Sequence, residues 1–288
     1  MEGLNLDNWT LGKKLGSGGC ADVYEAYLKD SSCLDYVIKV SALPRKKSTK
    51  ADKDQIRIAN LLYAENMIYR NFYKQKNFAS IPLRAYGEKN GYRYLVMERL
   101  GRTLGDVVRD EGPINESTVS RIGLELINAI QYMHTKNIIY VDIKPDNFMV
   151  NMKEDQAYCV DFGICDSFMS AVTGKHKKQV IGPISGTPTF LSLNCHLGTN
   201  ASRRDDIESL LYVLAYMIKG SLPWEKAPSD GDGSSIKASI SLEQLCEGMH
   251  PIWIDMLNTV RQYKFEDKPD YKWFGDQFKI LAGDYDPK

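Results

Sequence analysis

Two short motifs on either side of a strand-like segment constrain this chain more than any other feature. The first motif is Asp142-Ile-Lys144-Pro-Asp-Asn147, and the second is Asp161-Phe162-Gly163. An acid, a cation and an amide in the first motif are suited to act on one phosphoryl group, and a second acid follows in the other. This combination is far more specific than a single glycine motif. It predicts a site that binds a nucleotide, a metal ion and a hydroxyl group to be phosphorylated.

The length and charge of the chain limit its possible classes. With 288 residues, it is long enough for one large domain or two small lobes. A hydrophobic content of 43% allows a buried core and argues against disorder. Lys plus Arg and Asp plus Glu both number 37, so the formal net charge is zero and no nucleic acid is expected as a main ligand. The basic run Arg45–Lys50 predicts a solvated loop before a helix, with nucleic-acid binding or nuclear import as the lesser alternative.

The cysteines and the apolar segments indicate an intracellular protein, cytoplasmic or nuclear. Six cysteines are scattered without a Cys-x-x-Cys pair, which favours reduced thiols over disulfides or zinc. The N-terminal segment lacks a basic region followed by an apolar core, so no secretory signal is expected. The longest apolar run, Leu210–Ile218, is too short to span a bilayer and suits a buried helix. We therefore expect no membrane association.

A glycine-rich segment near the N-terminus predicts a hairpin. Apolar residues between Trp9 and Tyr27 frame a glycine turn, which indicates a strand, a tight turn and a second strand. Gly16 and Gly18 would let the backbone approach phosphate groups and donate its amides to them. Ala21 stands where a third glycine is usual, and it stiffens the tip. An ordinary glycine-rich hairpin is the competing interpretation.

A lysine in a strand and a glutamate in a helix form a candidate pair. Lys39 lies in the short β-branched strand Asp35–Val40, where it either needs an anionic partner or points to water from an edge strand. The apolar spacing of Gln55–Tyr73 predicts a helix with Glu65 in its middle. If this helix packs beside the strand, the pair would hold Lys39 against the α- and β-phosphates of ATP. A surface glutamate is the alternative.

The chain changes from strands to helices at its middle. Tyr92–Leu100 predicts a strand leading into a connector, where Leu100 would offer backbone groups to an adenine edge. Asp106 opens the next helix, and it either accepts a ribose hydroxyl or stabilises the first turn. Glu116–Thr135 is a strongly amphipathic helix that faces a core. Further on, Asp230–Ser235 predicts a surface loop.

Four further sequence blocks point to a known family. They are Ile143–Met149, Gly186–Gly198, Ser202–Leu210 with Gly220–Trp224, and Tyr263–Tyr271. With the motifs above, they resemble the eukaryotic protein kinase superfamily over nearly the whole length, and within it the casein kinase I and vaccinia-related kinase group. The resemblance implies an α+β, two-lobed protein kinase fold in a single domain over residues 1–288. It places a small, mainly antiparallel β N-lobe with one main helix at about 9–98, a hinge at about 98–101 and a larger, mainly α-helical C-lobe at about 102–283.

The resemblance also implies roles for individual residues. Asp142, Lys144 and Asn147 match catalytic positions: the catalytic aspartate, the lysine that balances charge on the phosphoryl group, and an asparagine that binds magnesium. Asp161 matches the second magnesium ligand, and Met97 falls at the gatekeeper position. The residues expected to bind the cofactor ATP are Leu15, Gly16, Gly18, Val23, Lys39, Glu65, Met97, Leu100, Asp106 and Asp161.

The chain departs from the family at Tyr140-Val141, where a His-Arg pair is usual. Without the arginine there is no cation to bind a phosphorylated activation segment, so activity should not depend on that phosphorylation. Without the histidine, the link between the catalytic loop and the Asp-Phe-Gly motif is in question, and we expect the tyrosine to substitute by packing. Two other matches support the loop: Thr187, bonded near the catalytic aspartate, and Asp206, which ties its own helix to the loop.

These features predict a serine/threonine protein kinase, similar to casein kinase I, that transfers the γ-phosphoryl group of Mg-ATP to protein hydroxyls. Lys144 and the resemblance favour serine or threonine as the acceptor. The basic segment Gly174–Lys178 would suit acidic or already phosphorylated protein substrates, and a solvated loop is the equal alternative. We expect a monomer with no regulatory tail beyond Lys288.

Two rival functions are compatible with the fold. A pseudokinase acting as a binding scaffold would account for Tyr140-Val141, although the intact Lys39, Asp142 and Asp161 count against it. A small-molecule phosphotransferase is the other rival, because a fold does not fix the acceptor. The block Gly186–Asn194, which resembles a platform for peptide substrates, weighs against that second rival.

Overall fold

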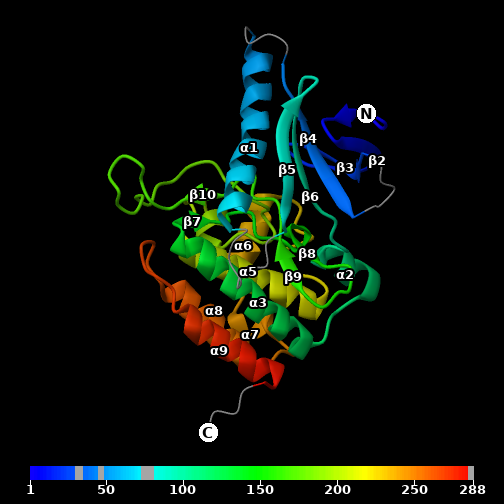
Figure 1. Cartoon of the computed structure of the whole chain (residues 1–288). Helices are drawn as coiled ribbons and strands as arrows, with labels where there is room; N and C mark the ends of the chain where they lie inside the picture. Colours follow the sequence, from blue (N-terminus) through cyan, green and yellow to red (C-terminus); the bar gives the residue numbers. More distant parts are fainter. Residues whose placement is uncertain (30–34, 45–48, 73–80, 285–288) are drawn as a thin grey trace. The chain divides into compact units, whose positions relative to one another are not determined.

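The structure is a computed structural model that describes residues 1–29, 35–44, 49–72 and 81–284 (Figure 1). Contacts divide the chain into two units. Unit 1 comprises Met1–Gly101, Asn151–Glu154 and Val160–Gly163, and unit 2 comprises Arg102–Val150, Asp155–Cys159 and Ile164–Lys288. The predicted α+β fold, with one mainly β part and one mainly helical part, is confirmed. Cys33 and most of the basic run at 45–50 lie outside the described residues.

Unit 1 is built on a six-stranded antiparallel sheet with the order β1-β2-β3-β4-β6-β5. Its strands are β1 (Asn5–Leu6), β2 (Trp9–Ser17), β3 (Asp22–Leu28), β4 (Tyr36–Ala42), β5 (Leu83–Lys89) and β6 (Tyr92–Glu98). Alternate side chains of neighbouring strands, including Leu11, Tyr24, Ile38 and Val96, form a buried apolar cluster. The predicted hairpin is present as β2 and β3, and β6 ends at Glu98, earlier than the sequence suggested.

One long helix of unit 1, α1 (Lys50–Phe72), packs against β4, β5 and β6 (Figure 1). Its buried side chains include Ala59, Leu62 and Tyr69, which recur at helical spacing. Thr49 begins the helix: its Oγ1 accepts a hydrogen bond from Asp52 N at 3.1 Å, and Asp52 Oδ2 accepts one from Thr49 N at 2.8 Å. This capping box explains why the helix begins earlier than its apolar pattern indicates.

Unit 2 is mainly helical. Its helices are α2 (Leu104–Glu111), α3 (Glu116–Thr135), the 3-10 helix η1 (Pro145–Asn147), α4 (Leu193–His196), α5 (Arg203–Lys219), α6 (Asp230–Ser239), α7 (Leu242–Leu245), α8 (Ile252–Gln262) and α9 (Tyr271–Ala282). Two short antiparallel pairs join β7 (Ile138–Ile139) with β10 (Asp166–Ser167), and β8 (Phe148–Val150) with β9 (Ala157–Cys159). The α3 helix has the predicted bounds and packs against α5 and α9. The α5 helix is buried along most of its length, so it forms the centre of this unit.

The predicted loop at Asp230–Ser235 is wrong, because these residues form the first part of α6. Two glycines there lower the intrinsic helix propensity by about 1 kcal/mol each relative to alanine. The helix is stabilised instead by its start: Ser229 Oγ accepts a hydrogen bond from Asp232 N at 3.2 Å, and the acids of the first turn suit the helix dipole. Gly233 is buried, so packing adds to the cap.

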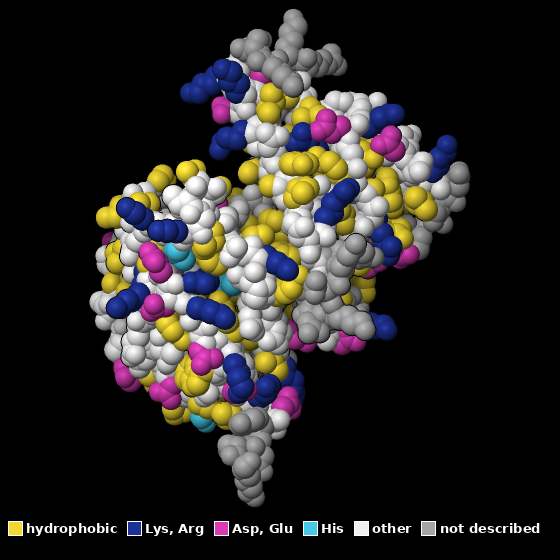
Figure 2. Space-filling view, turned by 60° about the vertical axis from the view of Figure 1, so that its left-hand side comes forward, with side chains coloured by type: hydrophobic (Ala, Val, Ile, Leu, Met, Phe, Trp, Pro, Cys, Tyr) yellow, Lys and Arg dark blue, Asp and Glu magenta, His cyan; other side chains and the backbone are white. Residues whose placement is uncertain are grey.

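The surface of the described residues carries both signs of charge. Figure 2 shows dark blue Lys and Arg side chains interspersed with magenta Asp and Glu on the face that it presents. Hydrophobic side chains are scattered between them, as on most protein surfaces. No helix in the described part of the chain combines the length and the apolarity required to cross a membrane.

Candidate functional site

Asp142 lies in unit 2 immediately before η1 and is held by its neighbours. Its Oδ2 lies 2.7 Å from Lys144 Nζ, and its Oδ1 accepts a hydrogen bond from Thr187 Oγ1 at 2.7 Å. Asn147 donates from Nδ2 to the Asp142 backbone oxygen at 2.9 Å and to Oδ2 at 3.2 Å. The Asp142 side chain is 13% exposed, so the carboxylate is fixed and still accessible. The first motif therefore forms one ordered cluster, and the bond expected for Thr187 is present.

The backbone that leads into Asp142 is fixed by the buried Asp206 of α5. Its Oδ2 accepts a hydrogen bond from Tyr140 N at 2.7 Å, and its Oδ1 accepts one from Val141 N at 3.0 Å. His134 Nε2 lies 2.8 Å from the same Oδ2, and His134 Nδ1 lies 2.7 Å from the hydroxyl of Tyr271. The predicted link between Asp206 and the loop is confirmed, and it extends through His134 from α3 to α9.

Val141 and Tyr140 show how this loop differs from the family pattern. Val141 has a φ of 71°, in the left-handed region that β-branched residues rarely adopt. Such a conformation costs on the order of 1–3 kcal/mol and persists only where the surroundings impose it, here through Asp206. The buried Tyr140 packs against Phe148, and its hydroxyl donates to Asn147 O at 2.9 Å. This hydrogen bond joins the start of the loop to its end, in addition to the bonds between Asn147 and Asp142. The substitution of Tyr140 for the histidine that links the loop to the Asp-Phe-Gly motif stays a prediction.

Gly186 brings the next segment against the catalytic loop. It has a φ of 102°, and a Cβ there would lie 2.9 Å from Leu191 Cδ2 and 3.1 Å from Val141 O. Both the φ and the close approach require glycine. Because residue 186 can lie this close to the loop, Thr187 reaches the carboxylate of Asp142.

Lys39 of β4 and Glu65 of α1 form the predicted ion pair within unit 1. Lys39 Nζ lies 2.6 Å from Glu65 Oε1 and 3.6 Å from Asp161 Oδ1. Burial disfavours the charge on Lys39, but the carboxylates of Glu65 and Asp161 outweigh it and raise the pKa of Lys39. Glu65 is fully buried and β4 is an internal strand, so the edge-strand and surface alternatives are wrong.

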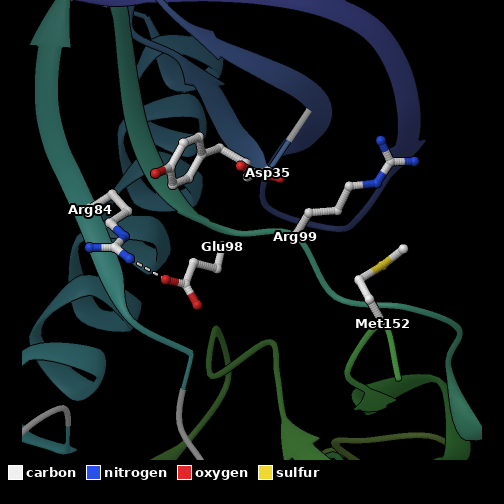
Figure 3. A pocket seen from close by; sticks show the side chains of 6 residues that line it. Asp35, Arg84, Glu98, Arg99 and Met152 are labelled. Atoms are coloured by element: carbon white, nitrogen blue, oxygen red, sulfur yellow. Dashed lines mark hydrogen bonds and ion pairs between the residues drawn. The ribbon is translucent and has the colours of Figure 1, made fainter. Parts of the chain in front are cut away.

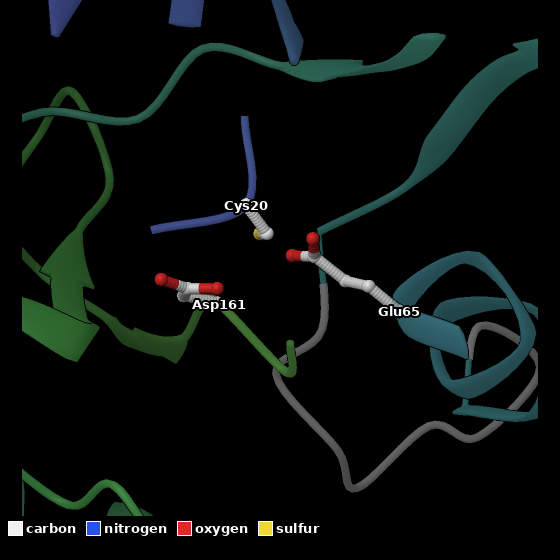
Figure 4. A group of neighbouring side chains, drawn as sticks. All are labelled: Cys20, Glu65 and Asp161. Carbon is white, nitrogen blue, oxygen red and sulfur yellow. The ribbon is translucent and has the colours of Figure 1, made fainter. Parts of the chain in front are cut away.

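Cys20 joins Glu65 and Asp161 in the same cluster (Figure 4). The Cys20 Sγ and one carboxylate oxygen of each acid all lie within 4.8 Å of one another. Burial, helped by the two acids, raises the pKa of Cys20 to about 11, so its thiol stays protonated at neutral pH. The Asp161 side chain is 40% exposed and offers the hard oxygen atoms that Mg²⁺ prefers. Asp161 therefore fits a magnesium ligand, whereas the protonated Cys20 does not.

The predicted phosphate-binding positions lie on the β2–β3 hairpin. Gly16 pairs with Val23, and Gly18 N donates to Ala21 O at 2.9 Å across the turn. Leu15, Gly16 and Gly18 are exposed and Val23 is half-buried. The hairpin thus presents backbone rather than bulky side chains at its tip, and its contact with a nucleotide stays a prediction.

The other predicted nucleotide positions lie on separate elements. Met97 is buried in β6, where it pairs with Val37 of β4, and Leu100 is half-buried beyond the end of β6. Asp106 lies in α2, where its Oδ2 accepts hydrogen bonds from Thr103 N at 3.0 Å and Thr103 Oγ1 at 2.8 Å. The stabilisation of the first turn is therefore present, and the binding of a ribose by Asp106 stays a prediction.

A separate pocket of about 720 Å³ lies at the end of β6 in unit 1 (Figure 3). Its lining residues are Asp35, Tyr36, Arg84, Glu98, Arg99 and Met152. Arg84 forms an ion pair with Glu98, and Arg99 Nη1 lies 3.4 Å from Glu25 Oε1. None of the predicted nucleotide-binding residues is among those that line this pocket, although Arg99 directly precedes Leu100.

The basic segment that precedes Gly186 is only partly solvated. Lys177 Nζ lies 2.6 Å from Asp166 Oδ2, and the His176 ring packs against two phenylalanines. Lys175 and Lys178 are exposed. Lys177 and His176 therefore anchor the segment, and the ammonium groups of Lys175 and Lys178 are exposed to solvent.

Two residues of this site region, His134 and Lys237, are not identified by any of the sequence motifs. His134 connects Asp206 with Tyr271, and a lone histidine in an apolar helix is ordinarily a core residue. Lys237 lies in α6, whose glycine-rich start suggests a loop. Its fully buried side chain reaches the segment that follows Thr187. Neither residue has a sequence pattern that distinguishes it from neighbours of the same type.

The geometry can be compared with known families. A family model described as a protein kinase domain matches residues 9–267, which is most of the chain. The matched range contains both side-chain clusters, that of Lys39, Glu65 and Asp161 and that of Asp142, Lys144 and Asn147. The chain therefore belongs to the protein kinase domain family.

Proposed function

We propose that this kinase domain is an active serine/threonine kinase, similar to casein kinase I, that transfers the γ-phosphoryl group of ATP to protein hydroxyls. The observation that carries the proposal is the ordered carboxylate of Asp142. Thr187 fixes one of its oxygens and Lys144 lies 2.7 Å from the other. An oriented base beside a cation is the arrangement that phosphoryl transfer needs, because positioning and charge supply most of the catalysis.

Each charged residue of the two clusters has a role in this mechanism. Asp142 orients the substrate hydroxyl and accepts its proton. Lys144 offsets the negative charge on the phosphoryl group as it transfers. Lys39, kept protonated by Glu65 and Asp161, binds the α- and β-phosphates.

Asn147 and Asp161 are the residues that would hold Mg²⁺. Because Asn147 Nδ2 donates to Asp142, its Oδ1 is the amide atom left to bind a metal ion. Asp161 offers a partly exposed carboxylate. When bound, Mg²⁺ neutralises charge on the β- and γ-phosphates.

We also propose that activity does not require a phosphorylated activation segment. Val141 occupies the position before Asp142 where the family usually has arginine, so it offers no cation to a phosphate. The segment has other attachments: Thr187 bonds to Asp142, and Trp224 Nε1 donates to Thr189 O at 2.7 Å. These bonds are present without any modification.

The test is transfer of labelled phosphate from ATP and Mg²⁺ to casein by enzyme that a phosphatase has first dephosphorylated. We expect incorporation at serine and threonine, located by mass spectrometry, and no transfer by Asp161→Ala. Absence of Asp161-dependent transfer to casein or to the enzyme itself would favour the binding scaffold. Phosphorylation of small molecules without any protein would favour the small-molecule phosphotransferase, and phosphotyrosine would contradict the proposed acceptor.

The preferred protein substrates are proposed to be acidic or already phosphorylated. Replacing Lys175 and Lys178 by alanine should lower kcat/KM for an acidic peptide by about threefold to tenfold, because each exposed ion pair contributes about 0.2–1 kcal/mol. A neutral peptide should be affected little. Alanine at the exposed Lys226 and Lys268 gives a control with the same net charge. Equal losses for acidic and neutral peptides would sink the idea.

We further propose that the protein works inside the cell as a monomer on protein substrates, without a nucleic acid or a membrane as a main ligand. The five described cysteines are free thiols, which suits a reducing compartment. The zero net charge gives no general attraction to polyanions. Light scattering coupled to size exclusion checks the oligomeric state, and a mass of twice 32.6 kDa would contradict the monomer.

A further inference from the structure

Lys237 of α6 is a fully buried lysine whose ammonium group binds backbone oxygens. Its Nζ donates to Pro188 O at 3.1 Å, to Thr189 O at 3.3 Å and to Leu191 O at 2.6 Å. The same Nζ lies 4.8 Å from the ring centre of Trp224. A buried charge is costly unless polar groups surround it. Three carbonyl oxygens and an aromatic face supply such surroundings here.

The carbonyl groups that Lys237 binds belong to the segment that follows Thr187. At its start, Thr187 Oγ1 donates to Asp142. At its end, Ser192 Oγ donates to Asp205 Oδ1 at 2.7 Å. Lys237 therefore holds the middle of a short backbone segment whose first residue bonds to the catalytic carboxylate.

We propose that Lys237 is a positioning residue for phosphoryl transfer: by binding the carbonyl groups of Pro188, Thr189 and Leu191, it places Thr187 where it orients Asp142. This inference rests on the proposed kinase activity of the same site. An ammonium group offers three N–H donors, a neutral amine two, and a methionine side chain none. The full set of three bonds therefore requires the protonated lysine.

Charged and titratable groups surround Lys237 from three other helices. They are Glu208 and Tyr212 of α5, Arg261 of α8, and Cys195 and His196 of α4. Glu208 is itself bonded to Arg261, with Oε1 3.2 Å from Nε, so neither acts on Lys237 as an isolated charge. Burial lowers the pKa of Lys237 to about 7. The loss of its proton above that pH removes at least one of the three bonds.

The pH dependence of activity and that of stability therefore have opposite signs. As the pH rises through about 7, kcat should fall because Lys237 loses its third donor. An unfolded lysine keeps its proton up to about 10.5, so between these values the unfolded chain binds more protons than the folded one. Linkage then requires that the contribution of this residue to stability increases with pH over the same range.

The test compares Lys237→Met with Lys219→Met. Lys219 makes bonds of the same kind, from Nζ to Leu245 O at 3.0 Å and to Glu247 O at 3.3 Å, away from Thr187. We expect Lys237→Met to lower kcat by about 10- to 100-fold, to leave ATP affinity unchanged, and to lose the decline of kcat above pH 7. The control should keep the kcat and the pH profile of the unaltered enzyme.

Hydrogen exchange supplies a readout that does not depend on activity. The amides of Phe190 and Leu191 donate to Thr187 O at 2.9 and 3.2 Å, and they should exchange faster in Lys237→Met only. If the unaltered enzyme transfers no phosphate, the kinase proposal fails. The rates of hydrogen exchange at Phe190 and Leu191 then decide on their own whether Lys237 holds this segment in place. Unchanged exchange would overturn that role.

Two other outcomes bear on the inference. Equal kcat values for the two methionine variants, with the decline above pH 7 retained in both, would overturn it. If Lys237→Met does not fold, Lys237→Arg provides a side chain that stays charged at every pH used. That variant should lose the decline of kcat above pH 7, and retention of the decline would also overturn the inference.

Discussion

Asparagine at position 142 is expected to lower kcat by about 10²- to 10⁴-fold, the usual contribution of a general base. The substitution Asp142→Asn keeps the shape of the side chain, and the Oδ1 of the new amide still accepts a hydrogen bond from Thr187. An amide does not take a proton from the substrate hydroxyl, so the chemical step is impaired. The amide also no longer accepts the hydrogen bonds that Lys144 and Asn147 donate to Oδ2. Single-turnover measurements with saturating ATP separate the chemical step from nucleotide binding, which should be unchanged.

Asp146→Asn is the matched control for Asp142→Asn. Asp146 lies in η1 of the same loop, its side chain is 50% exposed, and its Oδ1 lies 3.4 Å from Arg109 Nη2. Removing this charge should change kcat by less than about threefold, because exposed ion pairs contribute little. Comparable losses in both variants, or a loss under tenfold for Asp142→Asn, would contradict the proposed role of Asp142.

Lys39→Met is expected to reduce the free energy of unfolding by about 3–5 kcal/mol, the cost of leaving a buried charge without its partner. Glu65 is fully buried and loses its only bonded cation among the described residues, whereas Asp161 is 40% exposed and accessible to water. Without Lys39, Glu65 should bind a proton more readily in the folded state than in the unfolded one. The urea midpoint of the variant should therefore rise as the pH is lowered.

The double variant Lys39→Met with Glu65→Gln tests the cause of this loss. Removing both charges should recover most of the stability, so the two single changes are strongly non-additive. Lys14→Met breaks an exposed pair with Asp22, whose side chains are 45% and 37% exposed, and it should change the midpoint little. Equal losses for Lys14→Met and Lys39→Met would show that burial of Glu65 is not the reason.

The regular parts of this structure follow from local patterns in the sequence. The apolar spacing of Glu116–Thr135 predicts α3 with its observed bounds, because one face of that helix is buried against α5 and α9. The pairing of Lys39 with Glu65 is only partly predictable. A lysine in such a strand either has an anionic partner or points to water, and it is the motifs at 142–147 and 161–163 that favour the partner.

The parts that escape prediction depend on contacts between distant residues. The α6 helix has two glycines among its first four residues and is stabilised at its start by a serine cap, and its buried Lys237 reaches the backbone at Pro188, Thr189 and Leu191. The bond from Tyr140 to Asn147 O likewise depends on how the loop folds back. Neither contact produces a periodic pattern or a motif, so the residue types alone do not indicate them.

Val141 has a left-handed backbone that a β-branched residue adopts only under strain. Glycine or asparagine would adopt that φ with less strain, and the fold itself does not need a β-branched residue there. Relaxation of Val141 toward an ordinary conformation would turn the peptide that leads into Asp142. The bonds from Tyr140 N and Val141 N to Asp206 oppose that turn, so they help to fix the position of the Asp142 carboxylate. If activity does not require a phosphorylated activation segment, as proposed, the backbone at Val141 and the carboxylate of Asp206 are what hold Asp142 in place.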